Sequence, residues 1–310
     1  MAGGRVEEGG AMESRGVIIL AGDFGLGASG DGSWRLGERD LLGRLVLVAR
    51  QVAPAVVVAP ARTPLSPGYV ATNLAGARAI PPPDPAGSLG AALGAAIRLA
   101  GAAEVAVIPA GLPYLDAGWL TGLFEALAPA ADGVCAVDGE RRLPWLAVYR
   151  AAALAAPPRK GAQGAGDGLA ARDGAAPIGA GMTILPHPVA PAGPAGCTVA
   201  TPLDSAAAYR RALAHHGLCD SAQAAVTLEL FGSLRIRTGA ADLPIHADTV
   251  GRALQALRRI CPETEKLLPP EGELGEHFRF SINGQTVTTE LAHPLREGDR
   301  LILFSATVGG

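Results

Sequence analysis

The sequence lacks several features that mark common classes of protein. It has only four cysteines, with no Cys-x-x-Cys pair and no histidine at metal-ligand spacing from any of them: Cys135, Cys197, Cys219 and Cys261. We therefore expect neither a zinc site nor a disulfide framework, which fits a reducing cytoplasm. The formal net charge is -3 and no basic run occurs, so we expect no nucleic acid among the partners.

No stretch has the composition of a targeting or membrane segment. The first fifteen residues contain glutamates and no apolar run, and later apolar runs are interrupted by charged residues such as Arg98 and Glu104. We therefore predict a cytoplasmic protein without a membrane partner. The sequence is rich instead in small and apolar residues, with 42 Gly and 49% hydrophobic residues, and its 310 residues are enough for about two domains with cores.

The first two thirds of the sequence alternate short apolar runs with helical stretches. Strands are predicted over 16–21, 55–59 and 104–110, and helices over about 38–52, 88–100 and 116–128. Continuous apolar strands separated by helices are typical of a parallel sheet that is covered on both faces. Further strands at 133–137 and 145–149 extend the sheet, residues 157–176 are expected to form a mobile loop, and 201–216 is the expected final helix. We predict an α/β domain over residues 15–217.

The pattern changes after a linker at 217–224. Strands are predicted at 226–231 and 243–247, then a helix that begins at Asp248 or Thr249 and ends before Pro262. The helix has one apolar face: Val250, Ala253, Leu254, Leu257, Ile260 and Cys261. Asn283-Gly284 predicts a tight hairpin, and a turn at 296–299 leads into a last apolar strand. Two strands, a helix and further strands are the order of an α+β, β-grasp (ubiquitin-like) domain, which we predict over 224–310.

The run "SINGQTVTTELAHPLREGDRLILFSATVGG" resembles the end of the MoaD/ThiS family of ubiquitin-like sulfur carriers. The matching features are the Asn-Gly hairpin, "HPL" (293–295), "EGD" (297–299), an apolar strand and Gly309-Gly310; the family's frequent Pro-Pro is replaced by the stretch 305–308. The resemblance implies that the carboxylate of Gly310 is adenylated and then converted to a thiocarboxylate. Gly309 would be a slender neck that passes through a narrow channel.

The resemblance to sulfur carriers also implies partners. They are an E1-like adenylating enzyme (MoeB/ThiF-like), a sulfur donor and the large subunit of molybdopterin synthase (MoaE-like).

The first region resembles molybdenum cofactor guanylyltransferases of the MobA type, which have a Rossmann-like nucleotidyltransferase fold. The segments that carry this resemblance are "VIILAG" (17–22), "GSLGAALGAAI" (87–97), "LPWLAVYR" (143–150) and "TPLD" (201–204). Within the first segment, Leu20, Ala21 and Gly22 correspond to the start of the family's nucleotide-binding loop. The resemblance therefore assigns them to a degenerate nucleotide site.

The residues that carry the family's chemistry are replaced. Asp23 stands where the loop has its second glycine, Gly27 where it has an arginine, and no lysine precedes Lys160. Gly111 stands in place of the aspartate that holds magnesium. A carboxylate about 4 Å from a phosphate charge would cost roughly 4 kcal/mol, and phosphoryl transfer depends on metal and cations. We therefore expect a non-catalytic module with no metal residues and no covalently bound cofactor, with vestigial binding of GTP and magnesium, or of molybdopterin, left open.

Three functions remain open on the sequence. The first is a sulfur carrier for molybdopterin fused to a non-catalytic MobA-like module. The second is a bifunctional enzyme that retains guanylyltransferase activity, and the third is a carrier for thiamine or tRNA thiolation or a protein modifier. Several polar and aromatic residues are interpreted as structural: Asp31, Asp116 and Asp138 as turn or cap residues, Tyr114 and Trp119 as packing residues, and His215-His216 as complements of a helix dipole.

Overall fold

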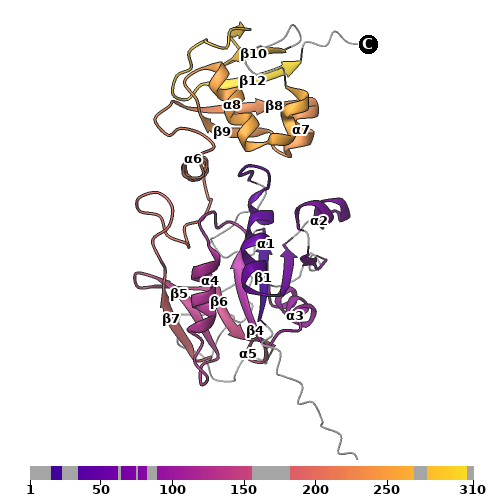
Figure 1. Ribbon diagram of the computed structural model, residues 1–310, viewed down its shortest axis with the longest axis vertical. Coiled ribbons are helices and arrows are strands. Elements are labelled where there is room, and N and C mark those ends of the chain that lie inside the picture. Colours follow the sequence, from indigo (N-terminus) through magenta and orange to yellow (C-terminus); the bar gives the residue numbers. More distant parts are fainter. Residues whose placement is uncertain are drawn as a thin grey trace, which may run out of the picture. The chain divides into compact units, whose positions relative to one another are not determined.

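The computed structural model describes residues 15–22, 34–61, 64–74, 76–81, 89–155, 182–268 and 278–305 (Figure 1). The chain groups into two compact units. The first unit contains Met1–Leu26, Val46–Pro109 and Asp116–Val189, and the second contains Gly27–Leu45, Ala110–Leu115 and Ala190–Gly310. The domain bounds predicted from the sequence, 15–217 and 224–310, stay a prediction.

The first unit is built on a seven-stranded sheet with the order β3-β2-β1-β4-β6-β5-β7. Four neighbouring strands are parallel: β3 (Arg78–Ala79), β2 (Ala55–Pro60), β1 (Arg15–Ala21) and β4 (Glu104–Pro109). The parallel arrangement of β2, β1 and β4 confirms the prediction, whereas β3 was not predicted. The remaining strands are β5 (Gly133–Asp138), β6 (Arg141–Arg150) and β7 (Ile184–Pro188).

The predicted parallel arrangement does not extend to β6, one of the two strands that were expected to extend the sheet. This strand runs antiparallel to both β4 and β5, so the sheet is mixed. The reason is local, because Asp138 pairs with Arg141 and only two residues connect β5 to β6. A connection of two residues can form a hairpin but cannot form the crossover that parallel strands need. Gly139 has a φ of 61°, which suits this tight turn.

Five helices are described along this part of the chain. They are α1 (Leu41–Val52), α2 (Pro67–Asn73), α3 (Leu89–Ala100), α4 (Ala117–Glu125) and α5 (Ala151–Ala155). Helix α3 packs against β1 and β2, and its buried face repeats at helical spacing with Leu89, Leu93 and Ala96. The β-branched run Val17–Ile19 at the centre of β1 is completely buried, as expected for a central parallel strand. None of the helices in the described part of the chain has the length and apolar character needed to span a bilayer.

The second unit contains a five-stranded sheet with the order β11-β10-β12-β8-β9. Its strands are β8 (Ala225–Leu230), β9 (Asp242–His246), β10 (Phe278–Ile282), β11 (Thr286–Thr288) and β12 (Arg300–Ser305). Neighbouring strands are antiparallel except for β12 and β8, which are parallel. The last strand therefore lies at the centre of the sheet. This arrangement confirms the strands predicted after residue 224.

Helix α8 (Val250–Ile260) carries the apolar face that the sequence predicted. Thr249 is its N-cap and accepts a hydrogen bond from the backbone of Arg252, and all six predicted face residues are buried. The 3₁₀ helix η1 (Pro262–Leu267) follows directly. Helix α6 (Ala206–His215), capped by Ser205, confirms the helix predicted near 201–216, and it packs against β9.

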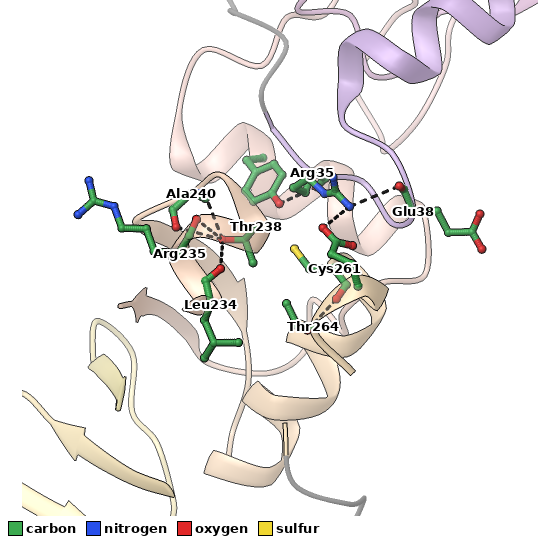
Figure 2. Close-up of polar contacts among 10 residues, drawn as sticks. Arg35, Glu38, Leu234, Arg235, Thr238, Ala240, Cys261 and Thr264 are labelled. Carbon is green, nitrogen blue, oxygen red and sulfur yellow. Dashed lines mark hydrogen bonds and ion pairs between the residues drawn. The ribbon is translucent and has the colours of Figure 1, made fainter. Parts of the chain in front are cut away.

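The sequence reading missed helix α7 (Gly232–Thr238), where it had only a glycine-containing turn. The helix buries only Leu234 and Thr238, so it has no extended apolar periodicity. Its end is fixed by polar contacts that are visible in Figure 2. The Thr238 hydroxyl donates to the Leu234 carbonyl at 2.9 Å and accepts from the Ala240 backbone at 3.2 Å, and Gly239 has a φ of 70°.

The Asn-Gly hairpin and the "EGD" turn hold each other in the second unit. Asn283 and Gly284 both have positive φ, which confirms the predicted tight turn. The Asn283 side chain donates to Asp299 Oδ1 and accepts from the backbone of Arg300, each at 2.8 Å. The Glu297 carboxylate accepts from the Ala225 backbone at 2.6 Å. These motif residues thus join the ends of β8, β10 and β12.

We predict that Asp299→Ala destabilises this corner of the sheet by about 1–2 kcal/mol, because the Asp299 carboxylate accepts hydrogen bonds from Asn283 and from the Arg296 backbone. Amide hydrogen exchange in β10 and β12, read by mass spectrometry, should accelerate accordingly. Glu290→Ala is the matched control, since it removes another carboxylate before β12, one that is exposed. Equal exchange in the two variants would contradict the proposed role of Asp299.

Candidate functional site

The first candidate site is the edge of the seven-stranded sheet where the parallel strands end. Ligands of open α/β sheets bind outside the carboxyl ends of such strands. Leu20 and Ala21, assigned by resemblance to a degenerate nucleotide site, end β1 and are buried. Gly22 follows with a φ of 112°. The three residues therefore lie at the expected edge, and their role in nucleotide binding stays a prediction.

Close packing between strand ends explains the glycine at this edge. The backbone of Ala61, just after β2, donates to the Ala21 carbonyl at 2.8 Å. A Cβ added at Gly22 would lie only 2.9 Å from the Cβ of Ala61. Gly22 is thus required by the approach of two strand ends as well as by its positive φ. The Ala21 carbonyl is already engaged, so Gly22 gives this edge its shape.

The described residues that follow these strands carry no charge. Gly22 follows β1, Ala61 follows β2, and β4 continues into Ala110–Pro113. Gly111 occupies the position where the resemblance expects a magnesium-binding aspartate, and its carbonyl accepts a hydrogen bond from the Leu203 backbone at 2.8 Å. The two sequence motifs at 109–113 and 201–204 therefore meet, through backbone groups that cannot replace a carboxylate. Asp23, Gly27, Asp31 and Lys160 lie outside the described residues.

Acidic and sulfur ligands do not gather in the described ranges. No group of three or more His, Cys, Asp or Glu side chains there could hold a metal ion. Asp116 caps helix α4 by accepting from the Trp119 backbone at 2.8 Å, which confirms its interpretation as a cap residue. Trp119 and Tyr114 are both buried, which confirms that they are packing residues.

A polar cluster in the second unit lies beside the loop that contains Gly111. The Nδ1 atom of His216 lies 3.3 Å from Arg44 Nη2, and its Nε2 atom lies 3.3 Å from the Pro113 carbonyl oxygen. Arginine can only donate, so Nδ1 accepts and Nε2 carries the proton that is donated to Pro113. The ring of His215 contacts the ring of Tyr114 edge-on, with centroids 5.3 Å apart.

This cluster keeps His216 uncharged. Burial, and then the nearby Arg44 charge, lower the pKa of His216 from 6.5 to about 4. The pair His215-His216 ends α6 as predicted, with His215 in the last turn and His216 as the C-cap, but the lowered pKa of His216 leaves this ring little charge for the helix dipole near neutral pH. Burial also raises the pKa of Tyr114 to about 12, with Cys197 as a further cause. The sequence showed the histidine pair, but it gave no sign of Arg44, which is far away in the chain.

The candidate carrier tail begins at β12. Leu301 and Leu303 are buried on one face, whereas Ile302 and Phe304 are partly exposed on the other. The strand is described up to Ser305. Gly309 and Gly310, which the resemblance assigns as the neck and the reactive terminus, lie outside the described residues.

The family model of the MobA-like NTP transferase domain matches residues 17–176, which is just over half of the chain. The chain belongs to this family. Its parallel β3-β2-β1-β4 order is the order of a Rossmann-like sheet. The first part of the chain therefore has a Rossmann-like nucleotidyltransferase fold, and we call it the MobA-like region.

Solved structures give partial likenesses. The chain is 20% identical to 2-C-methyl-D-erythritol 4-phosphate cytidylyltransferase from Thermus thermophilus, over 66% of this chain and 99% of that one, with a TM-score of 0.45. SAMP1 from Haloferax volcanii is 30% identical over 28% of this chain and 99% of its own, with a TM-score of 0.25.

The BexX/CysO complex from Amycolatopsis orientalis is 22% identical over 28% of this chain and 100% of the matched chain, with a TM-score of 0.26. No curated protein matches the chain. The identification therefore rests on the family match.

We predict that His216 makes the folded protein sensitive to mild acid. Its pKa is lower in the folded chain, so the unfolded chain binds more protons between pH 6.5 and about 4. The free energy of unfolding should be fully retained above pH 6.5 and should fall as the pH drops through this window. His216→Gln, which cannot titrate, should flatten this part of the curve in denaturant titrations.

The control is His293→Gln, which removes a histidine that is not part of the cluster. It should leave the slope between pH 6.5 and 4 as in the parent. A parent slope that persists unchanged in His216→Gln would contradict the assignment.

Proposed function

We propose that this protein is a sulfur carrier for molybdenum cofactor biosynthesis, with its reactive carboxylate at Gly310 and a MobA-like region that does not transfer nucleotides. The observation that carries the proposal is the central position of β12. A strand hydrogen-bonded on both sides, to β10 and to β8, is a firm anchor for the residues that follow it. Residues 306–310 continue from this anchor with the small residues Ala306, Gly309 and Gly310 among them.

The topology of the second sheet supports a β-grasp assignment. From one edge to the other, the strands lie in the order β9, β8, β12, β10 and β11. Strand β8 is antiparallel to β9 and parallel to β12. Helix α8 connects the first hairpin to the later strands, as the β-grasp order requires. The partial similarity to SAMP1, described as a small archaeal modifier protein, and to the CysO complex covers little of the chain, so the assignment rests on the topology.

The proposed chemistry takes place in two balanced steps. A carboxylate oxygen of Gly310 attacks the α-phosphorus of ATP on an E1-like, MoeB/ThiF-like partner, which releases pyrophosphate and leaves an acyl-adenylate. A hydrosulfide-level sulfur donor then attacks the acyl carbon, and AMP departs with the original oxygen. The product is a thiocarboxylate, ready for delivery through a MoaE-like large subunit. Glycines at the end allow the backbone to pass close to an enzyme surface without a Cβ in the way.

The uncharged residues at the described strand ends support a non-catalytic role for the MobA-like region. Phosphoryl transfer needs metal ions and cations around the phosphates. The described residues after β1, β2 and β4 are apolar, with Gly111 in place of the expected metal ligand. We therefore assign this region a binding or scaffolding role toward GTP, molybdopterin or a biosynthetic partner.

We predict that the protein gains one sulfur in exchange for one oxygen when it is incubated with a MoeB-type adenylating enzyme, ATP and sodium sulfide. Intact-mass spectrometry measures this change and also shows whether Gly310 is the last residue of the purified chain. Deletion of Gly310 should abolish the exchange, because the activated carboxylate would then lie one residue short. Thr307→Ala is the matched control and should be thiolated like the parent. Thiolation of the deletion variant, or none in the parent, would overturn the carrier proposal.

The second candidate is a retained guanylyltransferase, favoured by the family match over residues 17–176. We expect no pyrophosphate release above a protein-free blank from GTP, magnesium and molybdopterin, because the described strand ends offer no charge to the phosphates. Release that rises with protein concentration would instead support the bifunctional enzyme. The alternatives of thiamine or tRNA thiolation and of protein modification share the first step at Gly310 and differ only in the final acceptor.

A further inference from the structure

Residues 34–40 form a closed turn, which we call the strap. The strap lies in the connection between β1 and β2, just before helix α1. Arg35 pairs with Asp40 in an antiparallel bridge, and the backbone of Leu41 donates to the Trp34 carbonyl at 2.9 Å. Two ladder contacts between ends of so short a segment give it a defined shape. The strap is therefore a built element of the second unit.

The aromatic side of the strap packs against helix α6. The rings of Trp34 and Tyr209 have centroids 4.3 Å apart, at an angle of 38°. The Tyr209 hydroxyl donates to the Arg35 carbonyl oxygen at 2.6 Å. Tyr209 is completely buried, and burial raises its pKa well above the ordinary value of 10. The neutral hydroxyl thus fixes the backbone of Arg35 from one side.

The charged side of the strap is held by the junction between α8 and η1. Arg35 Nη2 lies 2.5 Å from Glu263 Oε1, and the Arg35 side chain is only 12% exposed. Figure 2 shows Arg35 directed at the segment that contains Cys261 and Thr264. A Cβ added at Gly37 would lie 3.9 Å from the Arg259 carbonyl oxygen, so the strap backbone also runs close to the end of α8.

Cys261 lies beneath this contact. It is completely buried, and burial raises the pKa of its thiol to about 12, against which the nearby Arg35 charge acts weakly. Cys261 is the C-cap residue of α8 and the N-cap residue of η1. Here the Arg35 side chain and Glu263 lie against it. Access to the Cys261 thiol therefore reports whether the strap is in place.

We propose that the strap is a docking element in which Arg35 binds Glu263, so that the β1–β2 connection of the MobA-like region secures the α8–η1 junction. Arg35 Nη2 contacts both Glu263 Oε1 at 2.5 Å and the Glu38 carbonyl oxygen at 3.4 Å, so one end of the guanidinium joins the strap backbone to the junction. The role is independent of whether Gly310 is thiolated.

The test measures alkylation of each cysteine in the full-length protein with a maleimide, at one pH, by peptide mass spectrometry. Arg35→Ala and Glu263→Ala should each raise the rate at Cys261 by roughly tenfold, because each leaves a largely buried charge without its ion-pair partner and opens the strap. The charge-reversed double variant, Arg35→Glu with Glu263→Arg, should restore protection. Failure of both single variants to raise the rate would overturn the proposal.

Two other cysteines distinguish strap opening from unfolding. Cys197 is buried elsewhere in the second unit, and Cys135 is buried in β5 of the first unit. Neither should react faster in the single variants. Equal acceleration at Cys197 and Cys261 would mean that the pair stabilises the whole unit, and the docking role would fail. Glu229→Ala is the matched control, since it removes another ion pair, that with Arg300 at 2.6 Å, away from Cys261.

A nucleotide arm tests the alternative use of Arg35. GTP with magnesium, added to the parent protein, should leave the Cys261 rate unchanged, because the arginine is committed to Glu263. If GTP raises the Cys261 rate, and Arg35→Ala removes that response, then Arg35 serves a nucleotide and the proposal is overturned.

Discussion

The second unit depends on the pairing of β12 with β8. These are the two strands of the sheet that run parallel to each other, and they lie between the antiparallel edges β9 and β10–β11. Leu301 and Leu303 of β12 pair with Leu228 and Leu230 of β8, and all four side chains are buried. Because β12 also bonds to β10, its loss would divide the sheet into two hairpins. The Asn283, Glu297 and Asp299 contacts keep the ends of these strands in register.

The described strand ends of the MobA-like region keep close backbone contacts, and the residues described directly after β1, β2 and β4 are uncharged. Gly22 still lets two strand ends approach closely, and the loop after β4 still lies in contact with the segment at 201–204. Such features depend on the backbone conformation, which is compatible with many different side chains. The catalytic function depends on single carboxylates and cations, which one substitution each can remove. At Gly111 the backbone contact with Leu203 is present, and the position carries no carboxylate.

Short-range sequence patterns predicted the features that depend only on neighbouring residues. Each of three predicted features follows from a few neighbouring residues and is present in the structure: the helical spacing of apolar residues in α8, its cap at Thr249 and the positive φ at Asn283-Gly284. Helix α7 was not predicted because it buries only two side chains and therefore has no apolar periodicity. The contacts of Arg35 with Glu263 and of Arg44 with His216 join residues that are far apart in the sequence, so no sequence pattern could have paired them. The antiparallel β6 follows from its two-residue connection to β5, which the strands predicted at 133–137 and 145–149 did not reveal.

The central place of β12 has a consequence for the synthesis of the protein. A ribosome makes β8 and β9 long before β12, and the antiparallel pair can close as soon as it emerges. The edge of β8 that will bond β12 must then wait, with its backbone groups open to water and to other chains. The sheet can be completed only after residues 300–305 have left the exit tunnel. Nascent chains stalled before that point would expose a strand edge, and this is the stage at which chaperones would find a substrate.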